Sequence, residues 1–217
     1  MTTSSTEIRH QVVTYCQKLA GSTLAAGVSG NISCLDRESG RVAISPSAMD
    51  YLIMTPEDVV LMDKQGELIE PARRPSSEWA MHLGCYQLRG DIGAVVHTHS
   101  PAATTLAVLG WELPAVHYMI ALSGTHQVPL APYHRFGSGE LAEAAVHAMG
   151  GGWACLLANH GVLATGPDLE AAWDLAENIE FCADLYLRAC AVGEPNILDA
   201  SQIADVVDEL SRYKKQH

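Results

Sequence analysis

The spacing of apolar residues predicts helices along much of the chain. Residues 6–20 place apolar side chains three and four positions apart, and Gly21 follows them, which predicts an opening amphipathic helix. The longest predicted helix covers residues 168–188, with Asp168 as its N-cap. Its predicted inward stripe comprises Leu169, Ala172, Trp173, Ala176, Ile179 and Ala183. Shorter helices are predicted over residues 75–90, 100–110, 138–151 and 201–213.

Short apolar runs bounded by turn residues predict strands between these helices. Two of them, over residues 30–45 and 58–70, are each interrupted by a polar turn and predict hairpins. A continuous apolar run over residues 154–166 indicates two buried strands or one strand with a bulge. Further strands are predicted over residues 93–99, 115–119 and 127–133. Hairpins mixed with helices predict an α/β fold whose sheet is mixed or largely antiparallel, with helices on its faces.

Composition narrows the class of protein. The 217 residues are 48% hydrophobic and show no linker-like stretch, so one domain covering residues 1–217 is expected. No apolar run is long enough for a membrane span, and the first residues lack a hydrophobic signal core. The six cysteines are scattered without a Cys-x-x-Cys pair, which is typical of reduced thiols. We therefore expect a soluble cytoplasmic protein that has no membrane partner.

The charge balance bears on possible partners. The net charge is −12, and the basic residues form no large cluster, so nucleic acid is not an expected partner. A small anionic substrate remains compatible with this charge, because surface charges beyond about 8 Å are largely screened at physiological salt.

The segment AVVHTHSP, residues 94–101, carries the first candidate chemistry. His97 and His99 are two positions apart in a predicted strand, so they share one face at about 6.6 Å along the backbone. That spacing lets two imidazoles converge on a metal ion. An isolated strand histidine is more often an ordinary hydrogen-bonded residue, so the pair alone does not establish a site. His160 also ends an apolar run and precedes a glycine, which permits a close backbone approach and a third ring at the same sheet end.

Polar residues beside the predicted helix starts and turns extend this candidate site. Glu78 begins the predicted helix over residues 75–90, where it either complements the helix dipole or acts as a metal ligand or general base. His82, one turn later, is either a partner of that carboxylate or an ordinary core histidine. The hydroxyl-rich turns at 27–33 and 44–51 have the composition of common turns. Together with Ser76 and Ser77 they could also supply neutral donors to a phosphate.

Seven motifs, in the same order and at the same spacing, resemble the class II aldolase/adducin family over about residues 6–213. They are GVSGNIS, ISPSAMDY, RRPSSEWAMH, DIGAVVHTHSPAATTLAV, PAVHYMIALSG, APYHRFGSGELAEA and LLANHGVLATGPDLEAAWDLAENIEFCADLYL. The resemblance implies a three-layer α/β/α domain that forms a homotetramer with active sites at subunit interfaces. It implies Zn²⁺, with Mn²⁺ or Co²⁺ as possible substitutes, bound by His97, His99, His160 and Glu78.

The resemblance also assigns roles to other residues. Glu78 corresponds to the position that alternates between metal ligand and proton-transfer base. Tyr118 corresponds to an acid at the subunit interface, and Tyr213 to a C-terminal tyrosine supplied by a neighbouring subunit. The implied phosphate-binding residues are Asn31, Ser47, Ser76 and Ser77. Three departures concern the substrate: Val28 replaces a threonine, Ala48 replaces a glycine, and the tail KKQH lacks an expected basic residue.

The implied activity is cleavage of a ketose 1-phosphate, L-fuculose 1-phosphate or a related 5-deoxypentulose 1-phosphate, to dihydroxyacetone phosphate and an aldehyde. A lysine Schiff base is the other way to stabilise the carbanion, but the lysines are few and lie in polar or terminal stretches: Lys18, Lys64, Lys214 and Lys215. Three alternatives remain open at this point. They are a phosphopentose 4-epimerase, in which the resemblance implies Asp at the place of Glu78, a 3-oxo sugar-acid phosphate decarboxylase, and a non-catalytic adducin-like module.

Overall fold

A seven-stranded sheet runs through the molecule in the order β3-β2-β1-β4-β9-β8-β7. The computed structural model describes residues 5–25, 27, 29–70 and 73–216, without the side chains of residues 211 and 213–216. The strands are β1 Asn31–Leu35, β2 Val42–Ile44, β3 Val60–Met62, β4 Ala94–Thr98, β7 Leu130–Ala131, β8 Ala154–Leu157 and β9 Gly161–Gly166. Only the β7–β8 pair of this sheet is parallel. The predicted mixed, largely antiparallel sheet is therefore confirmed.

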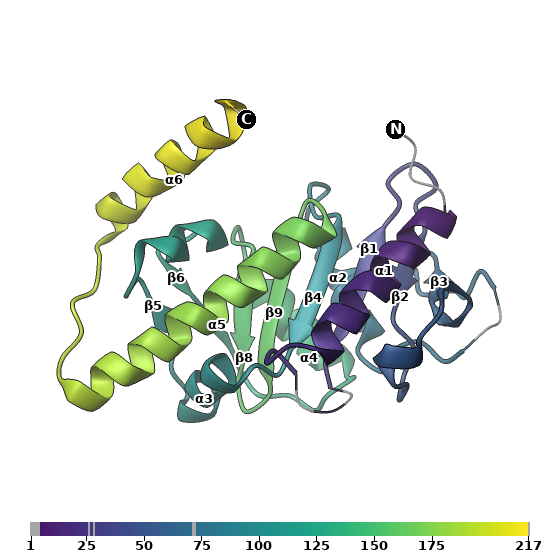
Figure 1. Cartoon of the computed structure of the whole chain (residues 1–217), viewed down its shortest axis with the longest axis horizontal. Helices are drawn as coiled ribbons and strands as arrows, with labels where there is room; N and C mark the ends of the chain where they lie inside the picture. The colour runs from purple at the N-terminus through teal and green to yellow at the C-terminus, as the bar shows by residue number, and fades with distance from the viewer. Residues whose placement is uncertain (1–4, 26, 28, 71–72, 217) are drawn as a thin grey trace.

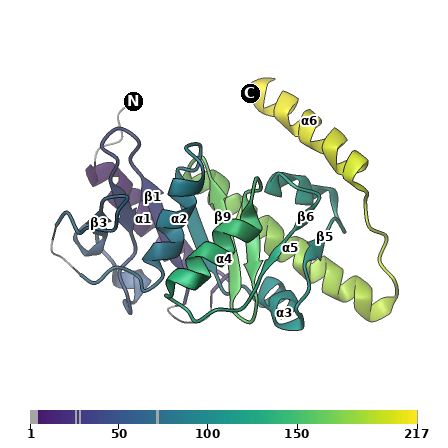
Figure 2. The same ribbon diagram turned by 180° about the vertical axis from the view of Figure 1, so that it is seen from behind.

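Helices cover both faces of the sheet, as Figures 1 and 2 show from opposite sides. One face carries α1 Ser5–Ala20, α3 Pro101–Leu109 and α5 Leu169–Val192, and the other carries α2 Trp79–Leu88 and α4 Gly139–Met149. Alternate residues of a strand point to opposite faces. Val96 accordingly joins the hydrophobic cluster under α1 and α5, whereas Val95 joins the cluster under α2 and α4. The predicted three-layer α/β/α arrangement follows from this alternation and is confirmed.

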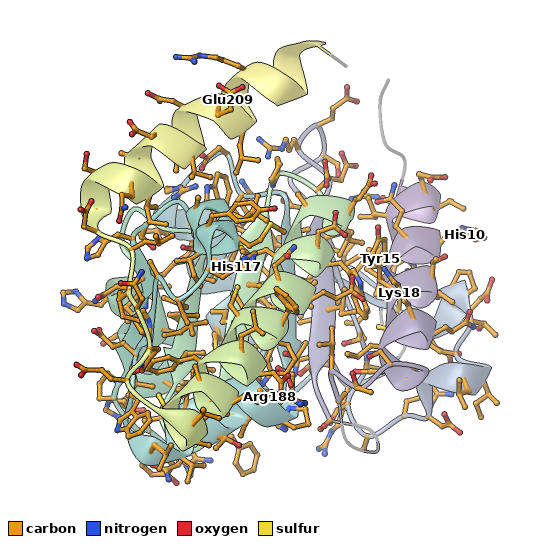
Figure 3. The ribbon with its side chains drawn as sticks, turned by 60° about the vertical axis from the view of Figure 1, so that its left-hand side comes forward. His10, Tyr15, Lys18, His117, Arg188 and Glu209 are labelled. Atoms are coloured by element: carbon orange, nitrogen blue, oxygen red, sulfur yellow. The ribbon has the colours of Figure 1, made fainter. Side chains whose placement is uncertain are left out.

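The packing of α5 agrees with its predicted pattern. The Asp168 carboxylate accepts a hydrogen bond from the backbone amide of Ala171 at 2.8 Å, which caps the helix. All six residues of the predicted stripe are buried. Trp173 is fully buried at its centre and lies against Tyr15 and Lys18, which reach from α1 toward α5 (Figure 3). The helix continues to Val192, one turn beyond the predicted end.

Some sequence predictions fail locally. The predicted strand over residues 115–119 is wrong: β5 is Leu113–Pro114, paired with β6 Gln127–Val128, and Tyr118–Ser123 forms the 3₁₀ helix η3. The His117 side chain accepts a hydrogen bond from the Met119 amide and so caps this helix, which a strand pattern does not reveal. The second arm of the hairpin predicted at 58–70 contributes only the bridge Met62 to Leu68.

The remaining elements are short or terminal. Two further 3₁₀ helices, η1 Tyr51–Ile53 and η2 Pro56–Asp58, precede β3. The last helix, α6 Ala200–Gln216, follows an extended stretch over residues 193–199 and lies beside η3 (Figure 1). No helix within the described part of the chain is long and apolar enough to cross a membrane.

Candidate metal centre

Three histidines meet where two neighbouring central strands, β4 and β9, end and begin. His97 lies in β4, His99 directly follows this strand, and His160 lies in the turn between β8 and β9. Because β4 and β9 are antiparallel partners, with Thr98 opposite Val162, the end of β4 lies beside the start of β9. The three rings stand edge to face, with centroids 4.8 to 4.9 Å apart. The structure thus brings the three predicted rings together.

The turn before β9 approaches the β4 backbone closely. A Cβ atom at Gly161 would collide with the carbonyl oxygen of Thr98, so this position accepts only glycine without a backbone shift. Asn159 has a φ of 55°, in the left-handed region that asparagine tolerates better than most residues. This tight turn places His160 beside the ring of His99.

Glu78 completes the cluster from the helix side. It is the N-cap residue of α2, but its side chain makes no capping hydrogen bond. Instead Oε2 lies 3.2 Å from Nε2 of His97, and Oε1 lies 3.3 Å from Nε2 of His160. One ligand atom from each of the four residues lies within 4.8 Å of every other. The sequence left open whether Glu78 complements the helix dipole or acts at a metal site. Its side chain lies at the histidine cluster, as the second interpretation predicts.

Hydrogen bonding prepares His97 to present a lone pair. Nδ1 of His97 lies 2.9 Å from the carbonyl oxygen of Val162, and a carbonyl can only accept, so Nδ1 carries the proton. In the neutral ring Nε2 is then unprotonated and faces Nε2 of His99 at 3.0 Å. A carbonyl partner on the remote nitrogen is the usual way in which proteins orient a metal-binding imidazole.

Burial and mutual charge set the protonation of the cluster. Burial, followed by the charge of His97, lowers the pKa of His99 and of His160 to about 4. Burial also acts to lower the pKa of His97, but the Glu78 carboxylate and the hydrogen bond to the Val162 carbonyl together outweigh it, so the net shift is upward. Burial acts to raise the pKa of Glu78, and the nearby histidines with the Asn31 hydrogen bond bring it well below its usual range. At neutral pH Glu78 is therefore ionised, while His99 and His160 are neutral.

The donor set fits a divalent metal ion. Oε1 of Glu78 is buried and has no hydrogen-bond partner among the described residues. Such an atom is costly unless it is paired or coordinates a cation. Imidazole nitrogens together with a carboxylate are the ligands of catalytic zinc sites and suit other divalent transition metals. Glu78, His97, His99 and His160 are therefore residues that could hold a divalent cation.

A cleft of about 200 Å³ opens beside this cluster. The predicted phosphate-site residues all line it, together with Glu78, His99 and His160: they are Asn31, Ser47, Ser76 and Ser77. No lysine or arginine is among its described lining residues, so hydroxyl, amide and backbone groups are the donors available to an anion. Ala48 also lines the cleft and has a φ of 54°, a conformation that favours the glycine expected there. Val28 lies outside the described residues.

Residues 10–187 match the family model described as "Class II Aldolase and Adducin N-terminal domain". The chain belongs to this family. A 5-deoxy-D-ribulose 1-phosphate aldolase of Bacillus thuringiensis is 47% identical over 208 residues, covering 96% of this chain and 97% of the relative. An L-fuculose phosphate aldolase of Escherichia coli is 36% identical over 208 residues, covering 95% of each chain. A solved L-fuculose 1-phosphate aldolase superposes with a TM-score of 0.93 at 41% identity, covering 96% of this chain and 98% of that one.

Of the two tyrosines predicted from the aldolase resemblance, Tyr118 does not line the cleft of its own chain. Tyr118 begins η3, is 49% exposed, and lies against His117 and α6 rather than among the cleft residues. Figure 3 shows His117 below α6, the helix that carries Glu209. Tyr213 belongs to α6, and its side chain lies outside the described residues.

The structure also adds residues that the sequence did not single out. Tyr51 and Phe136 line the cleft. The hydroxyl of Tyr51 is buried and donates to the carbonyl of Gly30 at 2.9 Å, whereas the Phe136 side chain is exposed. Neither residue occurs at a spacing that pointed to a site. His82, by contrast, was predicted from its spacing of four to be a partner of Glu78 or a core histidine; it is fully buried and reaches the carboxylate through Asn31.

Proposed function

We propose that the chain is a divalent-metal-dependent aldolase that reversibly cleaves a ketose 1-phosphate to dihydroxyacetone phosphate and a small aldehyde. The observation that carries the proposal is the cluster of Glu78, His97, His99 and His160 beside a cleft lined by serine hydroxyls. We favour a 5-deoxypentulose 1-phosphate, which yields acetaldehyde, over L-fuculose 1-phosphate, which yields lactaldehyde. The support is the 47% identity to a relative named for the first type of substrate, against 36% for one named for the second.

The reaction divides into tasks that this chain's residues can perform. Breaking C3–C4 transfers the proton of the C4 hydroxyl to a base, for which we propose Tyr118 of a neighbouring subunit, and leaves an enediolate, which gains a proton at C3. A bound divalent cation supplies Lewis-acid stabilisation of that negative charge. Glu78 would exchange the proton at C3 through Oε1, which has no hydrogen-bond partner among the described residues, and Ser76 and Ser77 would donate to the phosphate. The neutral imidazoles of His99 and His160 would hold the cation without competing for that proton.

We further propose Zn²⁺ as the metal and a cytoplasmic homotetramer as the working form. Three imidazoles with one carboxylate are a ligand set typical of zinc enzymes. All six cysteines are free, which suits a reducing compartment. A tetramer would supply Tyr118 and Tyr213 from neighbouring subunits, and the exposure of Tyr118 away from its own cleft supports this.

A coupled assay for dihydroxyacetone phosphate release tests the activity. The panel contains 5-deoxyribulose 1-phosphate, L-fuculose 1-phosphate and ribulose 5-phosphate, each with enzyme that is zinc-loaded or treated with chelator. We expect release from the first two substrates, faster for the first, and only with metal. Formation of xylulose 5-phosphate from the third without triose release would indicate an epimerase. Absence of bound metal after zinc supplementation would indicate the non-catalytic module.

Co-expression of two variants tests the shared active site. Glu78→Gln and Tyr118→Phe are each expected to be nearly inactive alone. If Tyr118 acts at the site of a neighbouring subunit, mixed tetramers contain sites with both native residues and regain part of the activity. Mixed oligomers without recovered activity, or a monomer by light scattering, would contradict the subunit proposal.

A further inference from the structure

A series of hydrogen bonds between buried side chains connects Glu78 with the interior between α2 and β1. Asn31 Nδ2 lies 2.9 Å from Glu78 Oε2, and Asn31 Oδ1 lies 2.6 Å from His82 Nε2. His82 Nδ1 lies 2.7 Å from the hydroxyl of Ser33, which in turn lies 2.6 Å from the hydroxyl of Tyr86. All five residues are buried. We call Asn31, His82, Ser33 and Tyr86 the α2–β1 relay.

The relay alternates between α2 and β1 because four residues of a helix and two residues of a strand advance by nearly the same distance. Glu78, His82 and Tyr86 are four residues apart along α2, which advances about 6 Å per four residues. Asn31 and Ser33 are two residues apart on one face of β1, which advances about 6.7 Å per two residues. Each strand side chain therefore lies between two successive helix side chains. The regularity explains how five polar groups are satisfied within a core.

The chemistry of the groups fixes the direction of every hydrogen bond. An ionised carboxylate only accepts, so Asn31 turns its NH₂ toward Glu78 and its carbonyl oxygen toward His82. His82 must then carry a proton on Nε2, which in the neutral ring leaves Nδ1 as an acceptor. The Ser33 hydroxyl donates its single proton to that nitrogen, and so accepts from Tyr86. Every proton of the relay is thus directed toward Glu78.

This polarity makes the two oxygens of Glu78 unequal. Oε2 receives the Asn31 hydrogen bond and lies beside His97, whereas Oε1 has no hydrogen-bond partner among the described residues and lies beside His160. We propose that the relay, through His82, is a positioning device that holds Glu78 in one orientation, with Oε1 as the oxygen presented to the cation and the substrate. The part that concerns substrate rests on the proposed function, and the part that concerns the cation does not.

Two substitutions of His82 separate positioning from packing. Glutamine offers an acceptor and a donor and keeps both hydrogen bonds, whereas methionine fills similar space and keeps neither. We expect His82→Gln to bind Zn²⁺ within about threefold of the wild-type Kd, and His82→Met to bind it about 10- to 100-fold more weakly, the range typical of lost ligand support. With substrate, kcat should fall in the methionine variant and recover in the glutamine variant, with little change in KM.

A matched control accounts for general destabilisation. Thr165 is a buried β9 residue whose hydroxyl donates to the carbonyl of Trp153 at 2.8 Å, apart from the relay. Thr165→Val should lower the Tm and leave the Zn²⁺ Kd unchanged. Ser33→Ala provides a second, smaller break in the relay if His82→Met does not fold, and it should weaken Zn²⁺ binding in the same direction. Equal Zn²⁺ affinity for wild type, His82→Met and Ser33→Ala would overturn the proposal.

Nitrogen NMR of ¹⁵N-histidine-labelled, zinc-loaded protein measures the polarity directly. The two signals lost in His82→Gln identify His82, and we expect Nε2 protonated and Nδ1 unprotonated. The opposite tautomer would overturn the proposal. If the affinity and NMR results hold while no ketose 1-phosphate is cleaved, the proposed function fails and the positioning of Glu78 stands.

Discussion

Asn31 and His97 lie directly opposite one another in the β1–β4 pair, and both approach the same oxygen of Glu78, at 2.9 Å and 3.2 Å. Directly opposed residues of an antiparallel pair point to one face of the sheet. The register of two central strands therefore sets the position of both groups. A slip of one residue would turn one of them to the other face. The centre is therefore built on central strands of the sheet and completed by the turn that carries His160.

Removal of one imidazole should remove the metal without unfolding the chain. We expect His160→Ala to weaken Zn²⁺ binding by more than about 100-fold, since even residues that only support ligands contribute about 10- to 100-fold. His147→Ala, at an exposed histidine of α4, is the control and should bind normally. Elemental analysis after dialysis, with circular dichroism for the fold, measures both. Full zinc content in His160→Ala would remove this residue from the ligand set.

Replacement of Glu78 by glutamine should separate proton transfer from binding. Glutamine keeps the shape but cannot accept the proton, so we expect kcat to fall by about 10²- to 10⁴-fold, the usual contribution of general acid–base catalysis. KM should change little, because the phosphate donors are untouched. Steady-state kinetics with excess Zn²⁺ measures both constants. A kcat within about twofold of the wild-type value would show that another group carries the proton.

Acid should destabilise the metal-free protein partly through His82. Burial lowers the pKa of His82 to about 3, against 6.5 for the free side chain. Between these values the unfolded chain binds a proton that the folded chain does not, so this residue makes stability fall as the pH falls from 6.5 toward 3. The contribution approaches about 1.4 kcal/mol per pH unit within that window.

Urea titrations of the chelator-treated wild type and His82→Gln between about pH 4 and pH 7.5 isolate this contribution. Glutamine does not titrate, so as the pH falls the free energy of unfolding should decrease more in the wild type than in His82→Gln. The other groups titrate in both proteins and cancel to first order. A difference that is independent of pH would mean that His82 is not kept neutral by the fold.

Ala48 offers a test of the cleft backbone. Its φ of 54° is costly for a residue with a Cβ atom, so Ala48→Gly should raise the free energy of unfolding by about 1 kcal/mol. The same change at Ala144, inside α4, should lower it by about 0.5–1 kcal/mol. Urea denaturation measures both. A loss of stability in Ala48→Gly would show that the loop is not strained at this residue.

Local patterns were sufficient for most of the secondary structure. The three- and four-residue spacing predicted α5, with its Asp168 cap and its buried stripe, because side-chain direction in a helix repeats within one turn. The same logic placed His97 and His99 on one face of a strand. It failed at residues 115–119, where the His117 side chain stabilises a 3₁₀ turn that an apolar run does not indicate.

The sequence by itself determined the ligand types, their local spacing and, through its motifs, the family. Only the tertiary structure decided which groups meet. The strand order β1-β4-β9 brings Asn31 beside His97 and His160 beside His99. The placement of α2 brings Glu78 and His82 next to these residues. The physical reason is the distance along the chain over which each kind of information acts. Side-chain periodicity acts over a few residues, whereas strand register and helix placement depend on contacts between distant parts of the chain.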